Sequence, residues 1–250
     1  MATPKETVWD LDPHTAAKHE ILRRYLSAWF PILGTYHGRI VYIDGFSGPG
    51  RYRKGEPGSP LIALDVATKQ RTATAGEIVF WFVEERDDRL AHLKQELAKI
   101  AIPAHFKVTA DSGRFDEKFE SVLESMEVGG QQIAPTFAFI DPFGFSGIPF
   151  ALIDRLLRQS RCEAFITFMV DAINRFLEHP EEKVVQHIVE AFGGDDDAIR
   201  VANCAGDRVA KLRDLYQSKL ATAAQYVRFF EMRDRSDRPR ALTMPLVTEC

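Results

Sequence analysis

The sequence predicts an α/β domain of three layers, in which a mostly parallel sheet lies between two layers of helices. Strand-like and helix-like segments alternate almost without interruption along the 250 residues. The strand-like segments are apolar at consecutive positions, which is typical of parallel strands buried on both faces. Several of them end at an acidic residue, and sheets of this class bind ligands beyond the carboxyl ends of their strands.

The chain begins with a predicted helical extension, residues 1–34. Asp12-Pro13 has the composition of a helix start, with an N-cap acid and then proline at the first helical position. Apolar residues recur at helical spacing after it, which predicts one amphipathic helix over residues 13–33. Residues 35–250 show no linker or internal repeat, so we expect a single domain overall.

The first two thirds of the chain predict four strands, each followed by a helix. Ser59-Pro60 indicates a helix start by the same pairing of cap and proline. The other bounds follow from apolar runs for strands and from 3.6-residue periodicity for helices. The predicted strands are 39–44, 78–84, 106–109 and 136–140, and the predicted helices are 59–68, 87–100, 115–126 and 149–159.

The last third predicts a fifth strand over 164–170, helices over 181–192 and 207–222, and a sixth strand over 226–231. A seventh strand, over 241–247, should then insert antiparallel between the fifth and the sixth. Pro245 falls within this segment, and proline disfavours a central strand because it removes a ladder hydrogen bond. The chain stops at Cys250 without a completing helix, so we expect a truncated C-terminal strand hairpin.

Composition restricts the classes of function. The polar N-terminus does not resemble a signal peptide, and no apolar run approaches the length needed to span a bilayer. The three cysteines are scattered, which favours reduced thiols in a cytoplasmic protein over a disulfide framework or zinc site. We predict no metal and no membrane association. The net charge of −4 argues against coating nucleic acid by bulk electrostatics, but a local basic patch remains open.

The loop after the first strand carries the strongest functional signal. Residues 44–50 read Asp-Gly-Phe-Ser-Gly-Pro-Gly, so that Asp44 is followed by the spacing Gly45-x-x-Gly48-x-Gly50. This spacing is neither the dinucleotide fingerprint nor a P-loop. An acid before a short glycine loop resembles the first motif of class I S-adenosylmethionine-dependent methyltransferases, which have a Rossmann-like fold. Gly45, Phe46, Gly48 and Gly50 are then cofactor-binding candidates, and the alternative is a tight turn after a buried strand.

Acidic residues at the ends of the next strands suit a nucleoside ligand. Glu84, with Glu85 as the fallback, could accept hydrogen bonds from both ribose hydroxyls. Asp111 could accept from an adenine amino group, and Asp44 could engage the methionine end of the cofactor. The alternative for each acid is that it caps the following helix, where negative charge is favoured.

The segment Asp141-Pro142-Phe143-Gly144 is similar to the Asp-Pro-Pro-Tyr motif of amino-methyltransferases that act on nucleic-acid bases. That likeness implies that Asp141 accepts a hydrogen bond from the acceptor and that Phe143 stacks on it, with Pro142 between them. The second proline is absent here, and Gly144 stands in place of the aromatic residue. The alternative is that Phe143 and Phe145 belong to the core, and for Phe145 we favour the core.

A basic insertion separates the glycine loop from the next helix. Arg51, Arg53 and Lys54 lie beside a tyrosine, so these three residues could bind phosphate or a stacked base of the substrate. The alternative is a solvated loop.

Taken together, these segments resemble the three-Cys-motif partner protein family (TcmP), bacterial proteins regarded as methyltransferase-like. The resemblance covers about residues 9–235 and implies S-adenosylmethionine as cofactor, with contacts at Asp44, Gly45, Gly48, Glu84 and Asp111 and the reacting end at Asp141. It also implies a partner protein with a three-cysteine, radical-SAM-like motif. The matching segments are Trp9 with Pro13-His14-Thr15-x-x-Lys18-His19, Tyr42–Gly50, Gly58-Ser59-Pro60, Phe82-Val83-Glu84 and Phe139–Gly144.

Three functions stay open at this point. The favoured one is an S-adenosylmethionine-dependent methyltransferase of unknown acceptor. The second is a methyltransferase-fold subunit with little or no chemistry that binds the three-cysteine partner. The third is a nucleic-acid enzyme or binder that uses the basic insertion.

Overall fold

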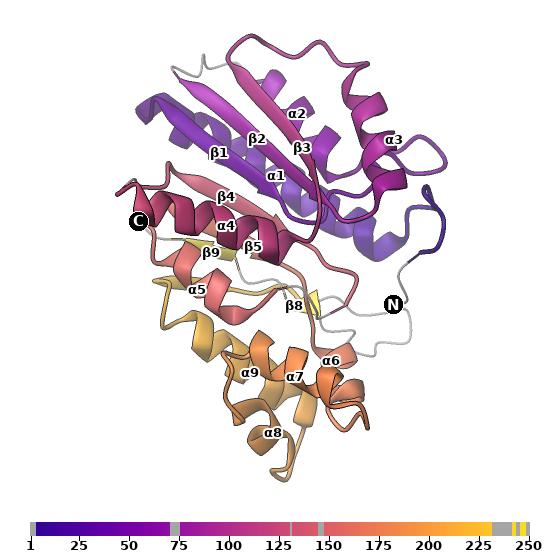
Figure 1. The fold of residues 1–250 in the computed structure, drawn as a ribbon, viewed down its shortest axis with the longest axis vertical. Coiled ribbons are helices and arrows are strands. Elements are labelled where there is room, and N and C mark those ends of the chain that lie inside the picture. The colour runs from indigo at the N-terminus through magenta and orange to yellow at the C-terminus, as the bar shows by residue number, and fades with distance from the viewer. Residues whose placement is uncertain are drawn as a thin grey trace. The chain divides into compact units, whose positions relative to one another are not determined.

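The computed structural model describes residues 4–70, 76–130, 132–144 and 148–231, and the backbone of 242–243 and 246–248. The chain forms two compact units (Figure 1). The N-terminal unit comprises the described residues of Pro4–Phe115 and Ala134–Phe139, and the C-terminal unit comprises those of Asp116–Ile133 and those from Ile140 onward. The predicted boundary at residue 34 stays a prediction.

The N-terminal unit is built on parallel strands in the order β3-β2-β1-β4. The bounds of the strands are Arg39–Asp44 for β1, Glu77–Glu84 for β2, Phe106–Ser112 for β3 and Thr136–Ile140 for β4. Strand β1 pairs in parallel with β2 on one side and with β4 on the other, and β2 pairs in parallel with β3. The order is that of a doubly wound α/β sheet, in which the strand order reverses beside β1. The predicted mostly parallel α/β sheet is confirmed.

Aromatic side chains fill the core of this unit, and their stiff, bulky rings favour a pleated strand. Tyr42, Phe80 and Phe137 are completely buried on three adjacent strands. The rings of Tyr42 and Phe137 stack 6.1 Å apart at an angle of 11°, and the Phe80 ring lies 6.0 Å from that of Tyr42. Trp29, on the first helix, packs 5.8 Å from Phe137. These contacts bury one face of the strands against helix α1.

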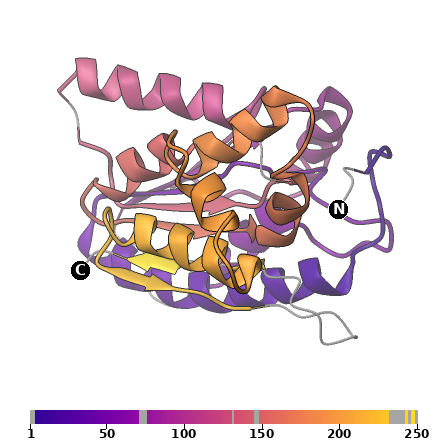
Figure 2. The same ribbon diagram turned by 90° about the horizontal axis from the view of Figure 1, so that it is seen from below.

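Three helices belong to the N-terminal unit: α1 (Pro13–Tyr36), α2 (Ser59–Thr68) and α3 (Asp87–Leu97). Helix α1 packs on α2 and β1, and Figure 2 shows it in indigo along one face of the strands. The predicted cap of α1 is confirmed, because the Asp12 carboxylate accepts hydrogen bonds from the amides of His14 and Thr15 at 3.0 Å. The predicted cap of α2 is corrected from Ser59 to Gly58, which caps without a side chain.

The C-terminal unit holds a helical cluster and short antiparallel strands. Helices α6, α7, α8 and α9 contact one another in sequence, and they appear in orange in Figure 2. The element bounds are α4 (Phe115–Val128), α5 (Phe150–Leu157), β5 (Cys162–Ile166), β6 (Phe168–Met169), α6 (Val170–Phe176), α7 (Glu182–Ala191), α8 (Asp197–Ala202), α9 (Arg208–Leu220), β7 (Tyr226–Arg228), β8 (Leu242–Thr243) and β9 (Leu246–Thr248).

Two predicted strands of this unit are corrected. The strand predicted over 226–231 is shorter, because β7 ends at Arg228. The predicted strand 164–170 is divided, because β5 ends at Ile166 and helix α6 begins at Val170. Helices α6 and α8 were not predicted. The predicted seventh strand is confirmed, since β9 pairs antiparallel with both β5 and β7. The segment is shorter than expected: β8 pairs with β6, and Pro245, between β8 and β9, lies outside the described residues.

No helix in the described part of the chain is long and apolar enough to cross a membrane. Helix α1 is long, with 24 residues, but it carries charged side chains that include Arg23 and Arg24.

The start of the sheet offers a test of the close strand packing. A Cβ added at Gly76 would overlap the carbonyl group of Gly38, whose oxygen accepts the amide of Glu77 at 2.9 Å. We expect Gly76→Ala to lower the free energy of unfolding by about 1–3 kcal/mol, because the backbone there cannot yield without separating β1 from β2. Urea unfolding measures the loss.

Gly38→Ala is the matched control, since a Cβ at that position meets nothing within 4 Å. Its unfolding free energy should stay within about 0.5 kcal/mol of the wild type. Equal stability of the two variants would contradict the close approach.

Candidate functional site

The glycine loop after β1 is fastened to the carboxyl ends of two neighbouring strands. The Gly45 amide donates to the Phe139 carbonyl of β4 at 3.0 Å, and the Ser47 amide donates to the Val83 carbonyl of β2 at 3.0 Å. The Ser47 hydroxyl lies 3.0 Å from the carbonyl oxygens of Asp44 and Val83. The loop is therefore held where the strand order reverses, which is the ligand-binding position of this class of sheet.

Close approach explains why glycines occupy this loop. A Cβ at Gly45 would lie 2.8 Å from the ring of Phe115, which also packs 5.8 Å from the Phe46 ring. A Cβ at Gly50 would lie 2.7 Å from Leu93 of α3. Gly48 has a φ of +63°, a backbone conformation that favours glycine. The segment is therefore a tight turn, and this geometry is also compatible with a loop that binds a ligand.

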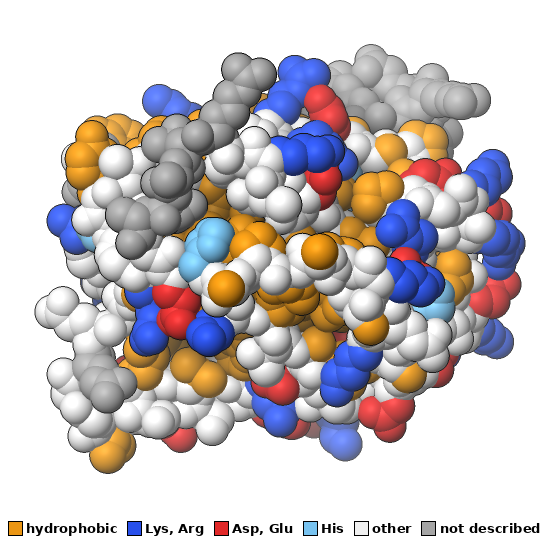
Figure 3. All heavy atoms as spheres, turned by 90° about the horizontal axis from the view of Figure 1, so that it is seen from above, with side chains coloured by type: hydrophobic (Ala, Val, Ile, Leu, Met, Phe, Trp, Pro, Cys, Tyr) orange, Lys and Arg blue, Asp and Glu red, His pale blue; other side chains and the backbone are white. Residues whose placement is uncertain are grey.

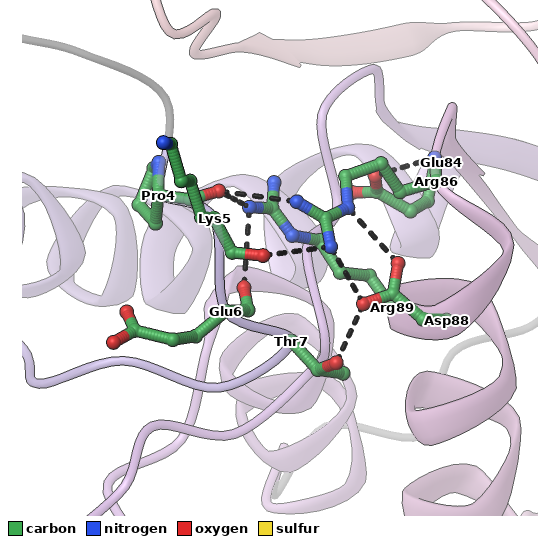
Figure 4. A network of polar contacts seen from close by, with 8 residues as sticks. All are labelled: Pro4, Lys5, Glu6, Thr7, Glu84, Arg86, Asp88 and Arg89. Carbon is green, nitrogen blue, oxygen red and sulfur yellow. Dashed lines mark hydrogen bonds and ion pairs between the residues drawn. The ribbon is translucent and has the colours of Figure 1, made fainter.

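Glu84 connects the end of β2 to the glycine loop. Its Oε2 accepts the Gly48 amide at 2.9 Å. Its Oε1 accepts the Arg86 amide at 2.9 Å, as Figure 4 shows. The side chain is buried, and burial raises the pKa of the Glu84 carboxyl, although these amides and the nearby Arg89 charge favour the ionised form. Each carboxylate oxygen can accept a further hydrogen bond.

Asp44 is completely buried at the end of β1. Its Oδ1 accepts a long hydrogen bond from the Phe46 amide at 3.3 Å. Burial raises the pKa of the Tyr42 hydroxyl far above its usual value, and the adjacent Asp44 charge raises it further. The carboxylate of Asp44 thus supplies negative charge directly beneath the glycine loop.

Asp111 lies within β3, one residue before its end. Its Oδ2 accepts a hydrogen bond from the indole nitrogen of Trp81 on β2 at 2.9 Å. The neighbouring Ser112 donates to Asp87 at the start of α3, at 2.8 Å. Asp111 therefore lies on β3, the strand beside β2. It is in register with Val83, the residue before Glu84. Its contact with adenine stays a prediction.

The basic insertion is folded back on the protein. Arg51 donates to Glu96 of α3 at 2.8 Å, and hydrogen bonds from Lys99 and Arg51 lower the pKa of Glu96. Arg53 donates to Asp10 at 3.3 Å. Lys54 is exposed at the tip. Both arginines are thus engaged by carboxylates, and substrate binding by these three residues stays a prediction.

The Asp-Pro-Phe segment belongs to the C-terminal unit. It follows β4, where the Ile140 carbonyl accepts the Thr167 amide at 2.8 Å. Asp141 is partly exposed, Pro142 is buried and the Phe143 side chain is 39% exposed. Phe143 therefore is not a core residue of this unit. Phe145, which sequence reasoning assigned to the core, lies outside the described residues.

Sequence reasoning missed several residues that surround the glycine loop. Nδ1 of His92, on α3, forms a hydrogen bond with the carbonyl oxygen of Pro49 at 2.7 Å. Arg89 is almost fully buried, with 2% exposure, and its guanidinium lies 4.6 Å from the centre of the Trp9 ring. A charged residue in a polar helix turn gives no sequence signal of burial, so Arg89 could not have been found from its pattern.

The surface drawn in Figure 3 has no single charged patch. On this face, lysine and arginine side chains are interspersed with acidic ones among the atoms that the structure describes. Within the described residues, no group of three or more His, Cys, Asp or Glu side chains comes together as a metal site would require.

None of the known protein-family models matches the sequence, and no curated protein matches it. Solved structures do show a distant likeness. The O-methyltransferase from Bacillus cereus in complex with SAH is 14% identical, with 96% of this chain and 83% of that chain covered and a TM-score of 0.46. Trm1 from Pyrococcus horikoshii with S-adenosyl-L-methionine is 11% identical, with 98% and 57% covered and a TM-score of 0.42.

The SAH-bound methyltransferase PaMTH1 from Podospora anserina is 11% identical, with 97% of this chain and 91% of that chain covered and a TM-score of 0.37. At such TM-scores the likeness gives neither the reaction nor the substrate of this chain. Membership of the three-Cys-motif partner family stays a prediction.

The raised pKa of Glu84 predicts a specific pH dependence of stability. A carboxyl with a raised folded-state pKa contributes stability that is fully present below its ordinary value of 4.5 and is lost as pH rises through the folded-state pKa. Raising the pH from below that value to neutrality should therefore cost the wild type more unfolding free energy than it costs Glu84→Gln. Urea unfolding over this pH range measures the difference.

Glu124→Gln is the control, because the Glu124 side chain is exposed on α4 and is not among the groups that shift the pKa of Glu84. That variant should keep the pH dependence of the wild type. A pH profile of Glu84→Gln parallel to that of the wild type would show that burial of Glu84 does not disfavour its charged form.

Proposed function

We propose that this chain is an S-adenosylmethionine-dependent methyltransferase whose cofactor lies over the glycine loop at the ends of β1 and β2. The observation that carries the proposal is the hydrogen bond from the Gly48 amide to the buried Glu84 carboxylate. It joins a close-packed glycine loop to an acid at the next strand end, at the topological switch point. That is the position in which this class of sheet holds a nucleoside ligand.

The residues present fit such a ligand. Glu84 keeps acceptor capacity on both oxygens beyond its two backbone partners, as the two ribose hydroxyls require. Gly48 brings the backbone close without a side chain in the way. Asp44, buried beneath the loop, would balance the ammonium group at the methionine end, and Asp111 on β3 would accept from the adenine amino group. We place no metal in the reaction.

The bound cofactor would supply an electrophilic methyl group on a sulfonium. The chain's own contribution is chiefly positioning, because transfer to a nucleophile needs alignment more than acid–base strength. Asp141 would accept a hydrogen bond from the hydroxyl or amino group of the acceptor, and the exposed Phe143 ring would stack against it. Pro142 would fix the backbone between these two residues.

The acceptor and the partner belong to the proposal. The three-cysteine, radical-SAM-like partner is supported by the sequence resemblance, and co-purification with such a protein tests it. Nucleic acid is the weaker acceptor class, since Arg51 and Arg53 already pair with carboxylates. A subunit without chemistry is excluded once the isolated chain turns over any acceptor.

Calorimetric titration tests the cofactor site. The wild type should bind S-adenosylmethionine and S-adenosylhomocysteine, and Glu84→Gln should weaken both about tenfold, which corresponds to about 1.4 kcal/mol. We expect weaker binding because the variant loses one hydrogen-bond acceptor for the ribose hydroxyls and the hydrogen bond from the Gly48 amide. Glu77→Gln, at the opposite end of β2, is the control and should bind as the wild type does. If the wild type gave no binding heat with S-adenosylmethionine and none with S-adenosylhomocysteine, the proposal would be wrong.

Transfer of a labelled methyl group to pools of nucleic acid, protein and metabolites tests the reaction. Asp141→Asn should lower turnover about 10²- to 10⁴-fold, because the amide oxygen still accepts a hydrogen bond but cannot take the proton that the acceptor loses on methylation. Its affinity for S-adenosylhomocysteine should stay unchanged. Wild-type turnover in Asp141→Asn would exclude Asp141 from the reacting end.

A further inference from the structure

The first residues of the N-terminal unit are tied to the start of helix α3. We call Pro4–Asp10 the N-terminal strap. Arg86 donates to the Pro4 carbonyl at 3.2 Å and to the Lys5 carbonyl at 2.9 Å. Arg89 donates to the same Pro4 carbonyl at 2.5 Å and also to that of Glu6 at 3.4 Å (Figure 4). Chain ends are usually poorly ordered unless they are fastened, and here two arginines fasten the strap.

The far end of the strap is tied to the insertion that follows the glycine loop. The Arg53 amide donates to the Trp9 carbonyl at 2.9 Å, and the Arg53 guanidinium donates to Asp10 at 3.3 Å. The ring of Tyr52 meets the Trp9 ring edge-on at 5.7 Å. The strap is therefore anchored on both sides of the glycine loop and crosses between them.

Trp9 lies directly over the proposed cofactor site. Its ring is held against the Arg89 guanidinium, 4.6 Å from the ring centre, in cation–π geometry. A Cβ at Gly48 would come within 3.6 Å of the Trp9 ring. Gly48 is the residue whose amide binds Glu84. Trp9 thus borders Gly48, and it contacts Arg89, whose charge acts on Glu84.

Arg89 connects the strap to the acid beneath it. Burial lowers the pKa of its guanidinium, and the Glu84 charge opposes that shift. A buried guanidinium needs several partners to replace water. Its partners include the strap carbonyls, the Trp9 ring and the Glu84 charge, so opening the strap would take hydrogen bonds away from a buried guanidinium.

We propose that the N-terminal strap is the cover of the cofactor site. In this arrangement Trp9 forms a wall against the adenosine part of the cofactor, and Arg89 is the positioning residue that holds the cover closed. This inference rests on the proposed function, since it concerns the same site. It adds a binding wall and a closing element to the residues that the glycine loop and the strand ends supply.

Closure and binding are linked by thermodynamics. A ligand that contacts the closed strap binds that state better and shifts the population toward it. A change that opens the strap therefore weakens the ligand in proportion to the closed fraction that it removes. The strap amides should therefore exchange more slowly when the site is filled, and loss of Trp9 or of the Arg89 fork should reduce affinity.

Hydrogen exchange of the full chain, with and without saturating S-adenosylhomocysteine, tests this linkage. In the wild type we expect slower exchange of the amides of residues 5–10 in the presence of the ligand. Trp9→Ala should weaken S-adenosylhomocysteine about tenfold and abolish the protection. Arg89→Lys should do the same, because a lysine keeps the charge but cannot bind two carbonyls and stack on the ring.

Tyr36→Ala is the matched aromatic control, since Tyr36 ends α1 and is 81% exposed. It should keep both the affinity and the strap protection. If Arg89→Lys fails to fold because Arg89 is buried, Trp9→Ala still decides the question. Its half-buried ring is a smaller risk to folding, and thermal unfolding of each variant checks this.

The outcomes separate the two proposals. If the wild type binds no S-adenosylhomocysteine, the cofactor proposal fails and this inference falls with it. Binding with unchanged strap exchange, and with equal affinity in Trp9→Ala, would overturn the cover and leave the cofactor site standing. Tighter binding by Trp9→Ala would also overturn it, because the strap would then compete with the ligand.

Discussion

The site depends on one hydrogen bond, from the amide of Gly48 to the carboxylate of Glu84. This hydrogen bond connects the loop that follows β1 to the acidic residue at the end of β2. Both residues are buried, so water does not compete for the hydrogen bond. Because Gly48 needs a left-handed backbone, a side chain there would strain the loop and disturb the Glu84 contact. The strap above and the helix behind both pack on this pair.

Much of the fold could be predicted because the parallel strands are buried on both faces. Strand β1 was predicted with its observed bounds, and β9 was correctly placed between β5 and β7. Helix α6 was missed because it follows β6 without a break, at Val170, so its apolar residues read as a continuation of the strand. The cap at Gly58 was missed because glycine caps with no side chain to mark it.

The site was only partly predictable, and the limit was tertiary. The position of Glu84 could be predicted because an acid at the end of a buried strand lies at the carboxyl edge of the sheet, and its contact with ribose stays a prediction. Arg51 and Arg53 carried no sequence sign that carboxylates on α3 and the strap would engage them. Arg89 shows the same limit, since its burial depends on residues more than eighty positions earlier in the chain. Contacts between distant segments decide these roles, and local patterns do not report them.

Arg89 links the strap to the acid at the end of β2 through charge. Burial raises the pKa of the Glu84 carboxyl, and the Arg89 charge opposes that shift. Burial likewise lowers the pKa of the Arg89 guanidinium, and the Glu84 charge opposes that shift in turn. Removing either partner would leave the other buried with less electrostatic support, which is costly. Because the same guanidinium donates to the carbonyls of Pro4 and Glu6, a ligand that contacts Glu84 would also act on the strap.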